Sequence, residues 1–332
     1  MDAIKIVFRR CVVWGNTPII RLLIETCAGI RDHNLLYAAA CCGHVSITRL
    51  LYTGCVADYH AVNFAARRGR TEIVSMLMAM GADPNIGGWD GYAIYTAAQF
   101  GYHETVKVLL GYPHGDPAQD YNAAIRLASG NGHIKTMKLL LADPRVDPAG
   151  GDNYAIRVSA LKGHIGAVKL LLKDLRVNPS AMNNFALKKA IENGHEIVVK
   201  LLIKDTRISD IRSISSLVKA AGNGHVNVVK LMVESDLIAG IRSKGMHMLL
   251  ERAFAYGQDR VLEFLLCHLG HSANITAYIS MNLIGTEHMI RRIPNKLARV
   301  DKMFRDHMFG YYIVIREFAR THLVVDLLPL FL

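Results

Sequence analysis

A motif of about 31 residues recurs along the chain, and this repeat limits the possible folds more than any other feature of the sequence. Each copy centres on a glycine, with a small residue four positions before it and a pair of apolar residues seven and eight positions after it. Successive glycines are 26 to 33 residues apart, a spacing too regular to arise from composition. We call them the anchor glycines: Gly15, Gly43, Gly69, Gly101, Gly132, Gly163, Gly194, Gly224 and Gly257.

The apolar positions after each anchor fall on one face of an amphipathic helix. The small residue before the anchor lets a preceding helix pack closely, and glycine suits a tight turn between the two helices. Prolines in stretches such as Asp143–Pro148 and Asp174–Pro179 prevent the second helix from continuing. A helix pair of this size cannot bury its own apolar face, so neighbouring pairs must stack. We therefore expect an all-α repeat solenoid of helix–turn–helix units, joined by short hairpin or extended loops.

The motif resembles the ankyrin repeat. Gly163-His164 and Gly194-His195 are each followed by V-x-L-L, and residues 81–85 read G-A-D-P-N, which matches the G-A-D-x-N turn of that family. The resemblance covers roughly residues 8–269. The family's T-P-L-H opening is absent, however, and residues such as Tyr95 and Arg126 stand where its histidine ties neighbouring loops together. This variant is similar to repeats in amoeba and giant-virus ankyrin proteins.

The period divides the chain into three parts. Residues 1–31 form a first unit that lacks an upstream hairpin, and we expect an N-terminal capping repeat there. Residues 32–269 hold the ankyrin-like repeats. Residues 270–332 break the period and contain a helical run in which basic and apolar residues alternate. This segment is expected to be a helical C-terminal cap, with a docking segment for a second partner as the alternative.

The motifs of common enzymes and metal sites are missing from the sequence. Five histidines follow anchor glycines, but each lies in a different unit, so they are about a helix diameter apart and cannot surround one metal ion. We expect them to close loops instead. The sequence contains no G-x-x-x-x-G-K-[ST], G-x-S-x-G or G-x-G-x-x-G loop and no complete H-E-x-x-H. The expectation is a protein that is not an enzyme and has no cofactor or metal.

Cysteine usage and the chain ends bear on location. The six cysteines form no C-x-x-C pair, which favours a reducing compartment. The sequence has no secretory signal, and no apolar segment is long enough to span a bilayer. We expect a cytoplasmic protein with no membrane association, or a protein of the host cytoplasm or nucleus if the source is viral.

The resemblance implies that a partner binds on the concave side, at the loop tips and the last residues of the first helix of each unit. Trp89, Tyr92 and Phe100 beside Arg67 and Arg68 have the composition of an interaction hot spot, although structural packing of these aromatic side chains is the alternative. Carried over by position, the candidate partner-binding residues are Arg67, Arg68, Trp89, Asp90, Gln99, Phe100, Gln119, Asp120, Lys162, Glu192, Asn193 and Asn223.

Charge is concentrated on a second surface, which we interpret as a plain solvated face, with a phosphate track as the alternative. The net charge is +11, and a basic residue stands six positions after most anchors, at a position expected to face solvent. This basic ridge comprises Arg21, Arg49, Lys107, Lys138, Lys169, Lys200 and Lys230.

The leading hypothesis for the function is a protein–protein interaction scaffold. The alternatives are a basic component of a ribonucleoprotein or nucleic-acid assembly, and an adaptor whose C-terminal segment recruits ubiquitin-ligase machinery. The sequence identifies neither the partner nor the oligomeric state.

Overall fold

The computed structural model describes residues 2–26, 33–54, 60–85, 92–113, 115–208, 214–235 and 243–269. The chain divides into two compact units, residues 1–216 and 217–332, with the boundary inside α15. The described residues form helices and connecting turns, and they contain no strand. The expected all-α repeat solenoid is confirmed.

In unit 1 each anchor glycine separates two helices of one pair. The helix before the anchor is called inner and the helix after it outer. The inner helices are α1 (Asp2–Trp14), α3 (His33–Cys42), α5 (His60–Arg67), α7 (Ala93–Gln99), α9 (Gln119–Gly130), α11 (Gly150–Leu161) and α13 (Ala181–Glu192). The outer helices are α2 (Thr17–Thr26), α4 (Val45–Leu51), α6 (Thr71–Ala79), α8 (His103–Leu110), α10 (Ile134–Ala142), α12 (Ile165–Leu172) and α14 (Glu196–Ile203).

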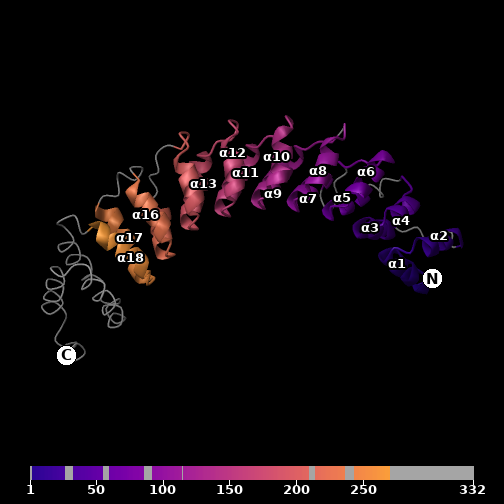
Figure 1. Ribbon diagram of the computed structural model, residues 1–332, viewed down its shortest axis with the longest axis horizontal. Helices are drawn as coiled ribbons and strands as arrows, with labels where there is room; N and C mark the ends of the chain where they lie inside the picture. The colour runs from indigo at the N-terminus through magenta and orange to yellow at the C-terminus, as the bar shows by residue number, and fades with distance from the viewer. Residues whose placement is uncertain are drawn as a thin grey trace, which may run out of the picture. The chain divides into compact units, whose positions relative to one another are not determined.

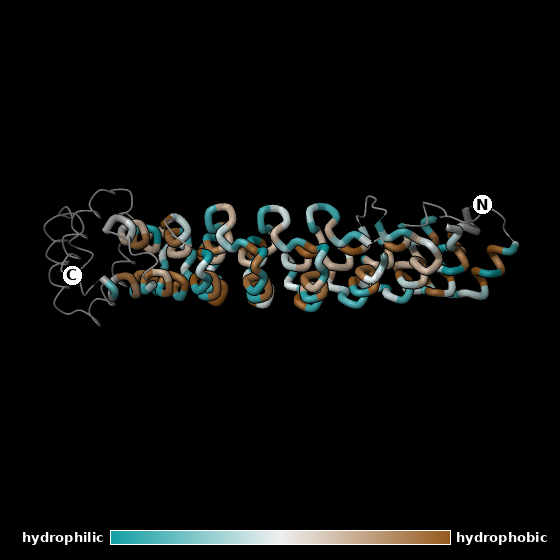
Figure 2. Tube along the Cα trace, turned by 90° about the horizontal axis from the view of Figure 1, so that it is seen from above, coloured by the Kyte–Doolittle hydropathy of each residue, from teal (hydrophilic) through white to brown (hydrophobic). Residues whose placement is uncertain are grey.

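The pairs of unit 1 stack side by side in two layers, one of inner and one of outer helices (Figure 1). Each inner helix contacts the inner helices of the neighbouring pairs, and each outer helix contacts the neighbouring outer helices. Small side chains make the inner layer compact, as at Ala65, Ala97 and Ala160, which are fully buried. Apolar and hydrophilic segments alternate along the described helices, as a two-layer solenoid requires (Figure 2).

Unit 2 contains most of α15 (Ile214–Gly222) together with α16 (Val226–Glu234), α17 (Ser243–Ala255) and α18 (Asp259–Leu269). Here α18 packs against both α16 and α17, and Met232, Val261 and Leu265 are buried. Residues 270–332 lie outside the described residues, so the expected C-terminal cap or docking segment stays a prediction.

The nine anchor glycines have φ between +65° and +92°, the left-handed region in which a side chain is strained. Eight of them end the preceding helix in a Schellman motif, whereas the amide of Gly43 donates to the carbonyl of Ala39. After α9, for example, the amide of Gly132 donates to the carbonyl of Ser129, and the amide of His133 donates to that of Ala128. This turn places the residue after each anchor at the start of an outer helix.

The first unit of the chain exposes apolar side chains. Trp14 is 73% exposed and Leu22 is 58% exposed, and Ile6, Val7 and Val13 are exposed as well. Capping repeats generally present a polar outer face, so this surface differs from that of a typical cap. The capping role of residues 1–31 stays a prediction.

Candidate interaction surface

The histidines that follow the anchor glycines join neighbouring units. The Nε2 atom of His133 lies 3.0 Å from the carbonyl oxygen of Gln99, and that of His195 lies 3.0 Å from the carbonyl oxygen of Leu161. Each acceptor stands two positions before the preceding anchor. His44 and His164 make the same contact, to Val13 and Gly130. The expected loop-closing role is therefore confirmed for these four histidines.

Other residue types take the same position in the units that lack histidine. The Nε of Arg70 donates to the carbonyl of Cys41 at 3.0 Å, and the ring of Tyr102 lies directly over Gly69. A Cβ atom at Gly69 would lie 2.5 Å from that ring, so the position must be glycine for steric reasons as well as for its φ. The turn thus recurs with the same geometry in several units, although the side chain after the anchor differs between them.

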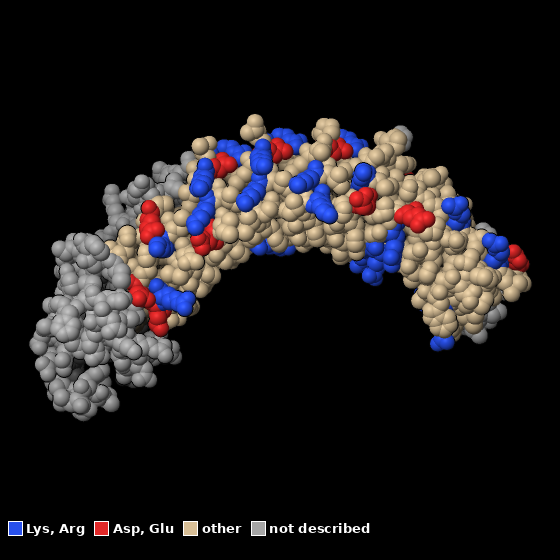
Figure 3. Space-filling model, viewed as in Figure 1, with Lys and Arg blue, Asp and Glu red and all other residues tan. Residues whose placement is uncertain are grey.

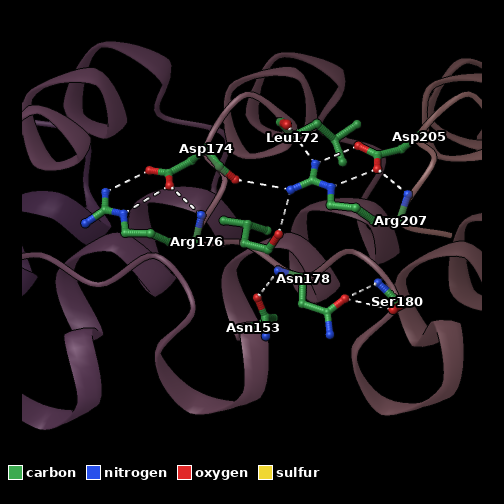
Figure 4. A network of polar contacts seen from close by, with 9 residues as sticks. Asn153, Leu172, Asp174, Arg176, Asn178, Ser180, Asp205 and Arg207 are labelled. Atoms are coloured by element: carbon green, nitrogen blue, oxygen red, sulfur yellow. Dashed lines mark hydrogen bonds and ion pairs between the residues drawn. The ribbon is translucent and has the colours of Figure 1, made fainter.

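The D-x-R loops that follow the outer helices carry a second set of bonds between units (Figure 4). The guanidinium of Arg207 forms a two-point ion pair with Asp205 and also donates to the carbonyls of Leu172, Asp174 and Val177 in the preceding loop. Arg145 and Arg176 form the same ion pairs with Asp143 and Asp174 and also reach the preceding loop.

These ion pairs change the proton affinity of the acids. The side-chain hydrogen bond from Arg207 lowers the pKa of Asp205 below its usual value, and burial opposes this shift. The pKa values of Asp143 and Asp174 are lowered in the same way by Arg145 and Arg176. The loops therefore stay ion-paired at neutral pH.

Three of the loop tips contain a left-handed turn that the sequence did not predict. Three successive residues adopt left-handed conformations near the start of each of the inner helices α9, α11 and α13: 120–122, 151–153 and 182–184. Asparagine stabilises this turn, because Asn153 Oδ1 accepts a 2.6 Å hydrogen bond from the backbone amide of Asn178. Asn122 makes the equivalent bond to Asp147 at 2.8 Å.

Arginine replaces the histidine of the missing T-P-L-H opening. Arg126 donates to the carbonyl of Asp120, and Arg157 donates to the carbonyls of Gly151 and Asp152, so each holds the left-handed tip of its own unit. Both guanidinium groups also lie over the ring of Tyr154, at 4.8 and 5.6 Å from its centroid. The cation–π contact of Arg126 links α9 to α11, and that of Arg157 lies within α11.

The sequence-predicted binding residues at the ends of the inner helices lie on the surface. Arg67, Arg68, Phe100 and Lys162 are exposed, with 44% of Phe100 accessible. Burial raises the pKa of the Cys41 thiol, and the positive charge of Arg68 opposes this shift. We call the residues one and two positions before the anchors from Gly69 to Gly194 the turn edge: Arg67, Arg68, Gln99, Phe100, Gly130, Asn131, Leu161, Lys162, Glu192 and Asn193.

Some predicted residues make bonds within the protein. Asn193 is exposed, but its amide donates to the carbonyl of Leu161 at 2.9 Å. Glu192 is half-buried and forms an ion pair with Lys189 at 2.8 Å. Gln99 is half-buried, and its backbone carbonyl serves as the acceptor for the next unit. These contacts give the three residues a structural role in addition to any contact with a partner.

The remaining predicted residues are scattered. Gln119 and Asp120 are the first two residues of α9, at the loop tip, and Asp120 is exposed with φ +49°. Asn223 is exposed and belongs to unit 2. Trp89 and Asp90 lie outside the described residues.

The expected aromatic cluster is not a single cluster. Tyr92 and Phe100 flank α7 at its opposite ends, separated by about 11 Å of helix. Tyr92 packs edge to face on Tyr95, and Phe100 packs on Tyr102. Proximity in sequence suggested a shared patch, but the rise of the intervening helix separates the two rings.

The basic ridge faces solvent as expected. Its seven residues are exposed in the structure, each on an outer helix. Within the described part of the chain, no group of three or more His, Cys, Asp or Glu side chains is placed to hold a metal ion. No helix among the described residues has the length and apolarity that a membrane span needs.

A family model described as Ankyrin repeats (3 copies) matches the chain over residues 8–88, 62–149 and 125–214. These overlapping matches cover more than half of the chain, and they coincide with the stacked helix pairs of unit 1. A comparison with curated proteins finds no match.

Proposed function

The chain belongs to the ankyrin-repeat family, and we propose that it is a non-catalytic protein–protein interaction scaffold whose turn edge binds the partner. Ankyrin repeats are in general protein-interaction modules. The proposal therefore starts from the family and uses the structure to select a surface and its residues.

The observation that carries the surface assignment is the exposure of Arg67, Arg68, Phe100 and Lys162 at the ends of α5, α7 and α11 in the inner layer. Arginine and aromatic residues are enriched among the residues that dominate binding energy at interfaces. The helices that present them, α5, α7 and α11, belong to one continuous layer. A partner with acidic and apolar groups would complement this composition.

The frame behind the turn edge is held by bonds between units. The histidines at 133, 164 and 195 and the D-x-R arginines fix each helix pair to the preceding one. A surface that is ordered before binding loses less conformational entropy in the complex. This supports recognition by a preformed surface.

A charge-reversal experiment tests the assignment. The full chain is immobilised and used to capture proteins from its native cell, and the captured proteins are identified by mass spectrometry. The variant R67E/R68E should lose the major partner. The matched variant R21E/R49E makes the same charge change on exposed positions of α2 and α4 and should retain it. Equal retention by both variants, with both still folded by circular dichroism, would contradict the surface assignment.

A further inference from the structure

The net positive charge of residues 92–208 is concentrated on the outer helices. The outer helices α8, α10, α12 and α14, with the residue that follows each, carry seven lysines and three acidic residues, Glu104, Asp143 and Glu196, so their net charge is +4. The rest of this stretch carries eight basic and seven acidic residues, so its net charge is only +1. All seven lysines are exposed. We call them the lysine stripe: Lys107, Lys135, Lys138, Lys169, Lys173, Lys200 and Lys204.

Basic residues on the two sides differ in what they contact. The five arginines of the stretch, at 126, 145, 157, 176 and 207, all bond to groups within the protein. Of the stripe lysines, Lys200 pairs with Glu196, whereas the other six make no ion pair or hydrogen bond with another described side chain. Arginine therefore holds the units together here, and the lysine ammonium groups remain available to an external anion.

The solenoid arranges these lysines in a line. The four outer helices are successive neighbours, and packed helices lie about 10 Å apart, so the stripe runs for about 30 Å across the stack. Lys169 and Lys173 are one helical turn apart on the same face, as are Lys200 and Lys204. Figure 3 shows Lys and Arg side chains in successive short rows over the part of the molecule that carries α8 to α13 in Figure 1.

We propose that the lysine stripe binds the phosphate backbone of a nucleic-acid duplex. A narrow line of like charges complements a linear polyanion, and the stripe is nearly as long as one turn of a duplex, about 34 Å. Lysine contacts phosphate as a point charge without reading bases, so the binding is independent of sequence. This surface is separate from the turn edge and acts independently of the proposed protein partner.

The composition of the outer helices favours a duplex over other anionic partners. A single strand binds by stacking its bases on aromatic side chains, and α8, α10, α12 and α14 contain no Phe, Tyr or Trp. A membrane surface is bound by inserting apolar side chains, and Ile197 is the only large apolar residue of these four helices that is strongly exposed.

Fluorescence anisotropy with a labelled 24-base-pair duplex of mixed sequence, as DNA and as RNA, tests the proposal on the full chain. The variant K138Q/K169Q should bind at least tenfold more weakly at 100 mM salt. It should also reduce the slope of log K against log salt by about 2, since each duplex phosphate contact contributes about 0.9. The control R9Q/R10Q removes the same charge from exposed positions of the inner helix α1, outside both the lysine stripe and the turn edge, and it should change affinity less than twofold.

Several outcomes would overturn the proposal. These are equal losses in the two variants, no binding of either duplex at 10 µM protein and 50 mM salt, or affinity that does not depend on salt. Tighter binding of a single strand, of polyglutamate or of phosphatidylserine vesicles would also contradict it, because each identifies a different partner. Capture of the protein partner should be unaffected by K138Q/K169Q, so failure of this proposal is distinguishable from failure of the turn-edge assignment.

Discussion

The arginines of the D-x-R loops provide a graded test of how the units are held together. Arg207 donates three side-chain hydrogen bonds to carbonyls of the preceding unit, Arg145 donates two, and one is observed for Arg176. Their side chains are 29%, 40% and 44% exposed, in the same order. Substitution by alanine should therefore lower the free energy of unfolding most for Arg207, less for Arg145 and least for Arg176.

The magnitude follows from the number of bonds. A hydrogen bond to a charged group contributes about 1.5–3 kcal/mol, and partial exposure reduces this to about 1 kcal/mol per bond. We therefore expect R207A to lower the free energy of unfolding by about 3 kcal/mol, R145A by about 2 and R176A by about 1. The conservative variant R207K keeps the charge but cannot reproduce the planar fork of the guanidinium. It should therefore lower the free energy of unfolding by more than half as much as R207A does.

Urea unfolding followed by circular dichroism measures these differences. With a slope of about 2 kcal/mol per molar urea, R207A should shift the midpoint by about 1.5 M. Repeat proteins can unfold in parts. If the interface at Arg207 lies in the part that unfolds first, R207A should shift the early phase of the urea transition more than the late phase. Equal effects of the three alanine variants, or an R207K variant as stable as the parent, would refute the assignment of stability to these bonds.

Three further predictions concern the loops and turns. D205N should destabilise the protein at pH 7, but its stability difference from the parent should shrink below about pH 4 in acid titrations. The reason is that Asp205, whose pKa is lowered in the folded state, stabilises the protein only while its carboxylate is ionised. A stability difference that stays constant with pH would contradict this. G163A should cost about 2 kcal/mol or more in urea unfolding, since this position has φ +74° and a Cβ would lie 2.6 Å from the ring of His195; a neutral effect would contradict it. M182G should raise the free energy of unfolding by about 0.5 kcal/mol, because Met182 is exposed with φ +52° and Gly151 occupies the equivalent tip position; destabilisation would contradict it.

The periodic features of the fold could be predicted from the sequence. The anchor glycines, the small residues before them and the apolar pairs after them depend on short-range spacing, and each predicted the correct turn or helix face. The exposure of ridge residues such as Lys138 and Lys169 followed from the same periodicity. The loop-closing role of His133 was predictable because it recurs at one position in several units.

The contacts between units were harder to predict. Arg207 bonds to carbonyls 30 to 35 residues away, and nothing in the local sequence distinguishes it from an ordinary turn residue. The recurrence of D-x-R at the same place in three successive loops was the available signal. The left-handed tips were also missed, because residues such as Tyr121 and Met182 rarely adopt φ > 0 without support from tertiary contacts.

Site-specific photo-crosslinking tests the central claim most directly, which is that a protein partner docks on the turn edge. A photoreactive amino acid replaces Phe100 or Lys162 on the turn edge and, as the control, Ile197 on α14, all of which are exposed. The account predicts the same protein adduct in the native cell from positions 100 and 162 and none from 197. Adducts from position 197 alone, or no protein adduct from either turn-edge position, would contradict it.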